Sequence, residues 1–195
     1  MKTFEKTLPE GYHPIYTIDA KDKKTLWMIN IVSFALFFVI ISPILLYYHY
    51  KTRLPIMLLL DAGTDRYIIL LVVYVAYVFG HELVHGAAYK ALTKQKLTFG
   101  IAPGVAFCGV PNIYVYRRPA LVAVLAPCIV FGFAFSAAIL LSTRISWKII
   151  WALALTVHIG GCSGDIWVAC LMLFRFCSTT LLVRDTGPKQ IFFSL

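Results

Sequence analysis

Two histidines and a glutamate are the first candidates for chemistry in this sequence, in the run His81-Glu82-Leu83-Val84-His85. On an α-helix, residues four positions apart lie about 40° apart around the axis, so two imidazoles can bind one Zn²⁺ from the same face. The glutamate then lies beside the metal, where it can act as a general base. Chance produces on the order of 0.002 such matches in a chain of this composition. The alternative, a pair of hydrogen-bonded core histidines, leaves the glutamate unexplained.

A catalytic zinc site needs a third protein ligand, and Asp165 is the candidate. Only Glu82 and Asp165, of 9 acidic residues, lie within long apolar segments, where an unpaired ionisable group costs roughly 2.5–3.5 kcal/mol. Lys90 and Arg175 mark the basic ends of the two segments. His81 precedes the first by 9 residues and Asp165 precedes the second by 10, so both side chains lie at nearly the same depth.

Further candidates lie just before Asp165. His158 precedes it by seven residues and shares its helix face, about 20° away, so it could be a ligand in place of Asp165, a partner near the site, or a core histidine. The run from Gly160 to Gly164 has three glycines, which favour either close helix packing or local unwinding. Within that run, Cys162 and Ser163 could line the site, although a buried inert thiol is the simpler interpretation of the cysteine.

These candidates sit in a very apolar chain. It has 195 residues, 60% hydrophobic and 14% charged, which excludes a disordered protein and an ordinary soluble domain. Each of four apolar segments exceeds the roughly 20 residues that a helix needs to cross a bilayer. We expect membrane spans at about 26–48, 67–89, 119–143 and 149–174.

The net charge of +9 is interpreted as a signal of membrane orientation rather than of nucleic-acid binding. With four spans, thirteen Lys and Arg fall on the side of the two termini and five fall on the other side. Because cytoplasmic loops carry the excess of Lys and Arg, both termini are expected in the cytoplasm. The predicted organisation is a polar tail at 1–25, a membrane domain at 26–175 and a second tail at 176–195.

The stretch 97–116 also lacks charge, but its glycines and prolines disfavour a helix. Its pieces are rich in Val, Ile, Phe and Tyr, which predicts a β-hairpin or re-entrant loop with strands near 97–101 and 113–116. An extended substrate could pair with the edge of this hairpin, and Asn112 could hold the substrate backbone. The predicted fold class is therefore an all-α polytopic membrane protein with four transmembrane helices and this short hairpin between spans two and three.

Several motifs carry a resemblance. The sequence resembles a family of small, four-span bacterial membrane proteins described as zincins, over almost its whole length. The shared features are Leu-Pro-x-Gly-Tyr at 8–12, His-Glu-Leu-Val-His-Gly at 81–86, the run 158–165 that ends in Gly-Asp, and an aspartate near Asp185. The sequence is also distantly similar to the site-2 protease class of intramembrane zinc peptidases.

This resemblance implies His81, His85 and Asp165 as zinc ligands and Glu82 as the catalytic base. The pair Ala126-Pro127 is similar to a small-residue-plus-proline feature of site-2 proteases. The Leu-Asp-Gly context typical of the site-2 aspartate is absent, and Ser-Gly-Asp stands in its place. The resemblance to site-2 proteases therefore implies the metal chemistry of this sequence more strongly than its substrate or its regulation.

The predicted function is an intramembrane zinc metalloendopeptidase, with one Zn²⁺ per chain, that cleaves membrane-protein or peptide substrates near the cytoplasmic side of a bacterial cytoplasmic membrane. Its expected partners are the substrate and the lipid bilayer, with no nucleic acid. Two alternatives stay open: a membrane metal carrier, and a non-catalytic scaffold that binds a metal or haem. The run Asp185-Thr186-Gly187 matches a local aspartic-protease signature, but we interpret it as a polar turn.

Overall fold

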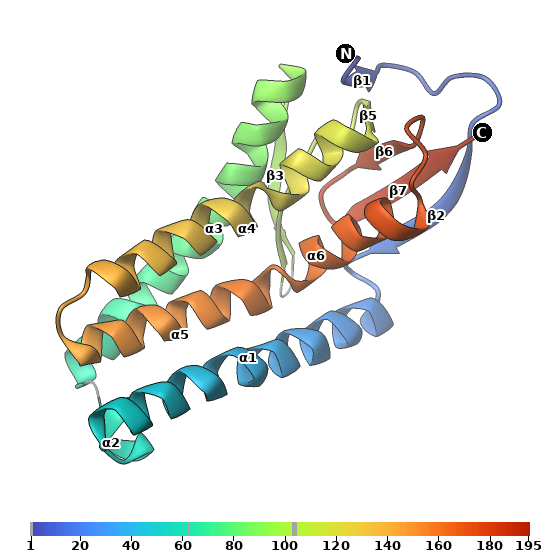
Figure 1. Ribbon diagram of the computed structural model, residues 1–195. Helices are drawn as coiled ribbons and strands as arrows, with labels where there is room; N and C mark the ends of the chain where they lie inside the picture. Colours follow the sequence, from blue (N-terminus) through green and yellow to red (C-terminus); the bar gives the residue numbers. More distant parts are fainter. Residues whose placement is uncertain (1, 62, 103–104) are drawn as a thin grey trace. The chain divides into compact units, whose positions relative to one another are not determined.

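Long helices alternate with short strands in the computed structural model, which describes residues 2–61, 63–102 and 105–195 (Figure 1). The elements in chain order are β1 (Phe4–Glu5), β2 (His13–Asp19), α1 (Lys23–Thr52), α2 (Ile56–Leu60), α3 (Thr64–Thr93), β3 (Thr98–Ala102), β4 (Val105–Gly109), β5 (Tyr114–Tyr116), α4 (Arg117–Leu141), α5 (Ile145–Gly161), α6 (Ser163–Cys170), the π-helical turn η1 (Leu171–Arg175), β6 (Leu182–Asp185) and β7 (Lys189–Ser194).

The chain divides into two units. The first consists of Met1–Ile29, Phe79–Pro127 and Gly164–Leu195, and the second of Asn30–Val78 and Cys128–Ser163. Helices α1, α3 and α4 contribute residues to both units.

Three helices, α1, α3 and α4, are long and apolar enough to cross a membrane, and a fourth span exists if α5 and the helical segment after it form one bent span. These helices overlap the four apolar segments predicted from the sequence. Many of their large apolar side chains are exposed, among them Phe34, Leu71 and Phe133. Such extensive apolar exposure is unfavourable in water and suits contact with lipid.

The first unit contains a five-stranded antiparallel sheet in the order β1-β5-β6-β7-β2. The chain is mostly helical, as predicted, but this sheet shows that the prediction of an all-α fold is wrong in this part of the chain. Strand β2 pairs with β7 from His13 opposite Ser194 to Asp19 opposite Lys189. Because these partners are about 170 or more positions apart in the sequence, no local pattern indicates their pairing, and each strand by itself looks like part of a polar tail.

Strands β3 and β4 form a separate two-stranded sheet, paired from Thr98 opposite Gly109 to Ala102 opposite Val105. The prediction of a strand near 97–101 is confirmed. Its predicted partner is wrong, because 113–116 supplies β5 of the larger sheet instead. Pro103 and Gly104, at the expected turn, lie outside the described residues.

The core of the first unit lies between the five-stranded sheet and the helical segments α3, α4, α6 and η1. Its largest cluster of buried side chains includes Tyr89 from α3, Val124 from α4, Met172 from η1 and Phe192 from β7. This packing explains why the short strands persist, since isolated strands of two to seven residues are marginal without an apolar face to cover.

In the second unit, α1 and α5 pack closely at Gly160, where an added Cβ would lie 3.1 Å from the carbonyl oxygen of Ser33. Helix α5 then ends at Gly161, and α6 begins at Ser163. Both features predicted for the glycine-rich run are therefore present. Gly160 permits close helix packing, and the helix is interrupted at Cys162.

Candidate metal centre

Two histidines of α3 and an aspartate of α6 converge within the first unit. His81 Nε2 lies 3.1 Å from Asp165 Oδ2, and His85 Nε2 lies 3.1 Å from His81 Nε2 and 3.5 Å from Asp165 Oδ1. The ligand atoms all lie within 4.8 Å of one another. Because α3 is regular through this segment, the spacing of four residues places both imidazoles on one face. The structure therefore brings together the three side chains predicted as ligands.

The separations suit a small tetrahedral cation. Four ligand atoms about 2.0 Å from a zinc ion lie roughly 3.3 Å from one another. The separation between the two imidazole nitrogens is 3.1 Å, and the nitrogens lie 3.1 and 3.5 Å from the two different oxygens of Asp165, close to that value. Two imidazoles and a carboxylate are also a donor set that catalytic zinc sites use. The residues present therefore fit a zinc ion with a fourth position left for water or substrate.

The protonation of His85 follows from its other ring nitrogen. His85 Nδ1 lies 2.8 Å from the carbonyl oxygen of Ala123 in α4, and a carbonyl can only accept a hydrogen bond. The Nδ1 atom therefore carries the proton. In the neutral imidazole, Nε2 is then the atom with the free lone pair, and it is the atom that faces His81 and Asp165. This arrangement is the one that a metal-binding histidine requires.

Asp165 owes its position to the interruption of the helical segment at Cys162. It is the third residue of α6, so its carboxylate lies in the first turn of that helix. The amide groups at a helix N-terminus favour negative charge nearby, which supports an ionised ligand there. The Asp165 side chain is 20% exposed, whereas the His81 and His85 side chains are 11% and 10% exposed.

Glu82 is adjacent to His81 on α3 and is partly buried. Among the described residues, no hydrogen-bond donor holds its carboxylate. A carboxylate beside the cluster that is not engaged in a structural bond is free to accept and release a proton, which is the property that a general base requires.

A second carboxylate anchors the same face of α3 one turn further on. The hydroxyl of Tyr89, four residues after His85, donates to Asp185 Oδ2 at 2.7 Å, and the amide of Gly187 donates to Oδ1 at 2.8 Å. Both Tyr89 and Asp185 are almost fully buried. Burial raises the pKa of Asp185 to about 6, although these hydrogen bonds oppose the shift. The predicted turn is present at Gly187, but the sequence did not indicate the burial of Asp185.

The β3–β4 hairpin packs directly on α3 beside the cluster. A Cβ added at Gly86 would lie 2.7 Å from the ring of Phe99 in β3 and 3.2 Å from Cys108 Sγ in β4, so glycine permits this approach. Burial, together with the nearby carboxylates of Asp185 and Glu82, raises the pKa of the Cys108 thiol to about 12. Cys108 is therefore a neutral thiol at physiological pH.

His158 belongs to the second unit, where it is fully buried. Its Nε2 lies 3.2 Å from the carbonyl oxygen of Cys128, which must accept, so Nε2 carries the proton. Its Nδ1 lies 2.8 Å from the hydroxyl oxygen of Tyr77 and accepts from it. These bonds involve both ring nitrogens, as expected of a core histidine. Its role as a ligand or as a partner of the cluster stays a prediction.

The other predicted site residues lie as follows. Cys162 is buried, with its sulfur 3.6 Å from His158 Nδ1, and Ser163 Oγ lies 2.7 Å from Ser33 Oγ. Asn112 is exposed in the turn between β4 and β5. The roles predicted for these three residues stay predictions.

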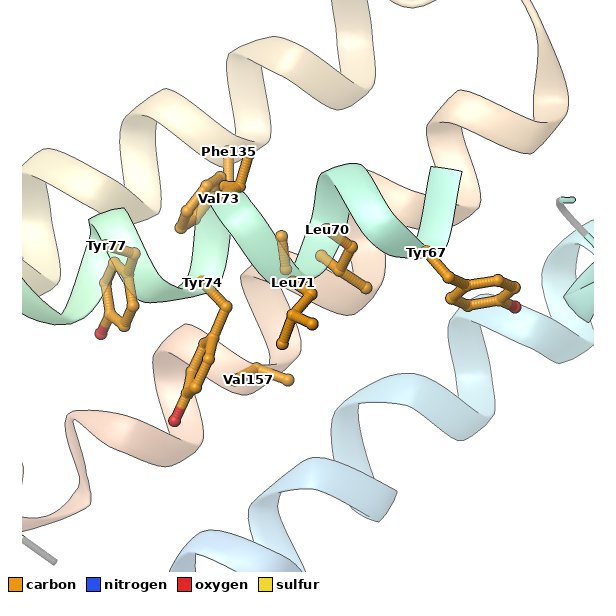
Figure 2. A pocket seen from close by; sticks show the side chains of 9 residues that line it. Tyr67, Leu70, Leu71, Val73, Tyr74, Tyr77, Phe135 and Val157 are labelled. Atoms are coloured by element: carbon orange, nitrogen blue, oxygen red, sulfur yellow. The ribbon is translucent and has the colours of Figure 1, made fainter. Parts of the chain in front are cut away.

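An apolar cavity of about 340 Å³ lies in the second unit against α3, α4 and α5 (Figure 2). Figure 2 shows Tyr74 and Tyr77 projecting from α3, with Val157 of α5 close by. Among the described residues that line it there is no carboxylate, imidazole or thiol. The lining of this cavity therefore supplies no acid–base or metal-ligating group.

A family model described as "putative zincin peptidase" matches residues 71–179, more than half of the chain. The chain belongs to this family. The matched range contains the His81–His85 motif and Asp165, so family membership supports a metallopeptidase, with zinc as the implied ion. Searches among curated proteins and among solved structures found no match to this zincin.

Proposed function

We propose that this zincin is an intramembrane zinc metalloendopeptidase that hydrolyses peptide bonds of membrane-protein substrates near the cytoplasmic side. The observation that carries the proposal is the convergence of His81, His85 and Asp165. Glu82, the neighbour of His81 on α3, supplies the carboxylate that a general base requires. The apolar helices support a location in the membrane.

The donor set defines which residues would hold the ion. His81 and His85 would bind through Nε2 and Asp165 through a carboxylate oxygen, because these are the atoms that face one another. A zinc ion bound there supplies Lewis acidity, which polarises a peptide carbonyl and lowers the pKa of water to about 7. The bond from His85 Nδ1 to Ala123 keeps the imidazole in the required tautomer throughout.

Glu82 has the proton-transfer role. One carboxylate oxygen accepts a proton from the attacking water as the water adds to the peptide carbonyl carbon. The carboxylic acid then donates that proton to the nitrogen of the leaving amine as the C–N bond breaks. Glu82 ends the cycle ionised, so a single residue acts first as base and then as acid.

The β3–β4 hairpin is the proposed substrate-binding element. Within the described residues, β3 pairs only with β4, so its other edge has unpaired backbone groups. Phe99 and Ile101 on β3 are 48% and 74% exposed, which provides apolar contacts along that edge. A helical substrate buries its peptide bonds in its own hydrogen bonds, so it must unwind before cleavage. Pairing with an exposed strand edge would stabilise the unwound segment.

A metal analysis and one substitution test the function. We expect purified protein to contain one zinc ion per chain without haem absorbance. Glu82→Gln removes the base but keeps the size and leaves the three ligands intact. It should retain zinc and lose cleavage of a helical membrane substrate by at least about 100-fold, since general acid–base catalysis contributes roughly 10²–10⁴-fold. Zinc content and cleavage in detergent or vesicles measure both effects.

Glu10→Gln, at an exposed position in the N-terminal segment, is the matched control and should leave both quantities unchanged. Zinc-free wild-type protein that cleaves normally would refute the proposal, as would full activity of Glu82→Gln. If wild-type protein binds zinc and moves it across vesicles without cleaving any substrate, the carrier alternative replaces the peptidase. A haem spectrum would favour the scaffold.

A further inference from the structure

The hydrogen-bond acceptor of His85 lies four residues before a proline. Helix α4 contains Pro127 in its interior, and in a regular helix the N–H of residue 127 would donate to the carbonyl of Ala123. Proline has no N–H, and its ring also pushes the carbonyl four residues earlier away from the helix axis. Ala123 is that carbonyl, and it accepts from His85 Nδ1 at 2.8 Å.

We propose that Pro127 is a positioning residue of the metal centre, which frees the Ala123 carbonyl so that this carbonyl holds His85 in its metal-binding tautomer and orientation. This inference rests on the proposed function only for its catalytic consequence. The structural claim, that the proline releases the acceptor of the histidine, stands on the geometry of α3 and α4 alone.

The burial of the pair gives this bond its importance. Ala123 is completely buried and His85 is nearly so. Because water is excluded, a carbonyl that lost its helical partner would cost free energy unless another donor replaced that partner. The His85 N–H is that donor. Each group thus satisfies the other, and the imidazole is locked with Nε2 directed at His81 and Asp165.

An amide at position 127 would weaken this arrangement. In Pro127→Ala, the new N–H competes for the Ala123 carbonyl, and the carbonyl can turn back toward the axis of α4. The bond to His85 then lengthens, so the imidazole loses its preference for one tautomer and part of its basicity. Loss of a partner behind a metal-binding histidine typically lowers metal affinity by 10–100-fold.

Pro127→Ala should weaken zinc binding but should not weaken helix α4. This difference distinguishes a positioning role from a structural role. Alanine is a far better helix former than proline in a helix interior, so Pro127→Ala should leave the melting temperature unchanged or raise it. A residue that only supported the fold would lower zinc affinity and melting temperature together. We expect Pro127→Ala to weaken zinc binding about tenfold while the protein remains at least as stable.

The experiment compares full-length wild-type protein, Pro127→Ala and Pro43→Ala in detergent. Pro43 lies inside α1, in the second unit, and is the matched control. Zinc affinity is measured by competition with a chelator, and melting temperature by circular dichroism. In zinc-free protein, ¹⁵N NMR of the His85 ring nitrogens reports the tautomer without metal or substrate. We expect a protonated Nδ1 in wild-type protein and in Pro43→Ala, and a mixture of tautomers in Pro127→Ala.

An unchanged zinc affinity and an unchanged His85 tautomer in folded Pro127→Ala would overturn the inference, and equal losses in the two proline variants would overturn it as well. The outcome is separable from the peptidase assignment. Wild-type protein that binds zinc without cleaving substrates would refute the enzyme and leave the affinity and NMR comparison intact. Cleavage by wild-type protein combined with a null result for Pro127→Ala would refute only the positioning role.

Discussion

At the scale of single residues, two aspartates of the first unit have contrasting partners. Asp165 faces two imidazole nitrogens, whereas Asp185 accepts hydrogen bonds from the Tyr89 hydroxyl and the Gly187 amide. Both are linked to one face of α3, where His81, His85 and Tyr89 follow one another at intervals of four residues. Asp165 thus contributes to the candidate metal centre, while Asp185 fixes the rotation of the same helix.

The burial of Asp185 predicts a specific pH dependence. Its pKa is raised to about 6 from an ordinary 3.8, so the folded state prefers the protonated form. Its contribution to the free energy of unfolding is fully present below about pH 4 and is lost as the pH rises through 6. Asp185→Asn cannot ionise. Between pH 4 and 7, wild-type protein should therefore lose on the order of 2 kcal/mol relative to Asp185→Asn.

Thermal unfolding in detergent with a chelator present measures this difference, because metal release then cannot contribute to it. Glu10→Gln, which changes an exposed carboxyl, is the control and should follow the wild-type curve. A constant gap in stability between wild-type protein and Asp185→Asn across this pH range would contradict the prediction.

At the scale of elements, the end of β4 and the β6–β7 turn meet backbone to backbone. A Cβ added at Gly109 would approach the amide nitrogen of Gly187 and would lie 2.9 Å from the carbonyl oxygen of Asp185. The amide of Val110 also donates to that carbonyl at 2.8 Å. The proposed substrate hairpin is thereby attached to the end of β6 at Asp185, and glycine at position 109 permits this close approach.

Gly109→Ala should therefore destabilise the protein by about 1–3 kcal/mol, since backbone atoms cannot move aside as a flexible side chain can. The matched control is Gly132→Ala in α4, where an added Cβ would lie 3.8 Å from His158 Nε2, an ordinary contact. A glycine in a helix interior costs roughly 0.5–1 kcal/mol relative to alanine, so this control should be neutral or slightly stabilising. Melting temperatures measure both, and equal values for the two variants would disprove the close packing.

At the scale of the whole molecule, the proposed enzyme depends on its orientation in the membrane. The excess of Lys and Arg on one side predicts that both termini lie in the cytoplasm, together with the basic ends of α3 and η1. The candidate metal centre would then lie nearer the cytoplasmic face, since His81 and Asp165 are 9 and 10 residues from those basic ends.

Reporter fusions in a bacterial host test this orientation. A fluorescent protein fused after Leu195 should fluoresce, because it folds in the cytoplasm. Alkaline phosphatase fused after Lys51, at the end of α1 that is expected on the opposite side, should be active, because it requires export. The reverse pattern would place the candidate metal centre nearer the outer face and would contradict the proposed cytoplasmic-side cleavage.

The amino-acid sequence was sufficient for everything that depends on local periodicity and composition. The apolar lengths predicted the membrane-sized helices, the spacing of four residues placed His81 and His85 on one face, and equal depth indicated Asp165 as their neighbour. The strands near 97–101 and 113–116 also followed from their composition, although their pairing did not. These features follow from sequence because helix geometry and apolar length involve residues close together in the chain.

The tertiary structure alone revealed the five-stranded sheet, the burial of Asp185 and the bond from His85 to Ala123. Apart from the local pairing of β6 with β7, each depends on partners from 38 to about 180 residues apart, and no periodicity links such distant positions. Pro127 illustrates the difference. From the sequence it is a proline in an apolar helix, whose missing N–H merely weakens that helix. Only the packing of α4 against α3 brings the carbonyl of Ala123, which Pro127 frees, to the imidazole of His85.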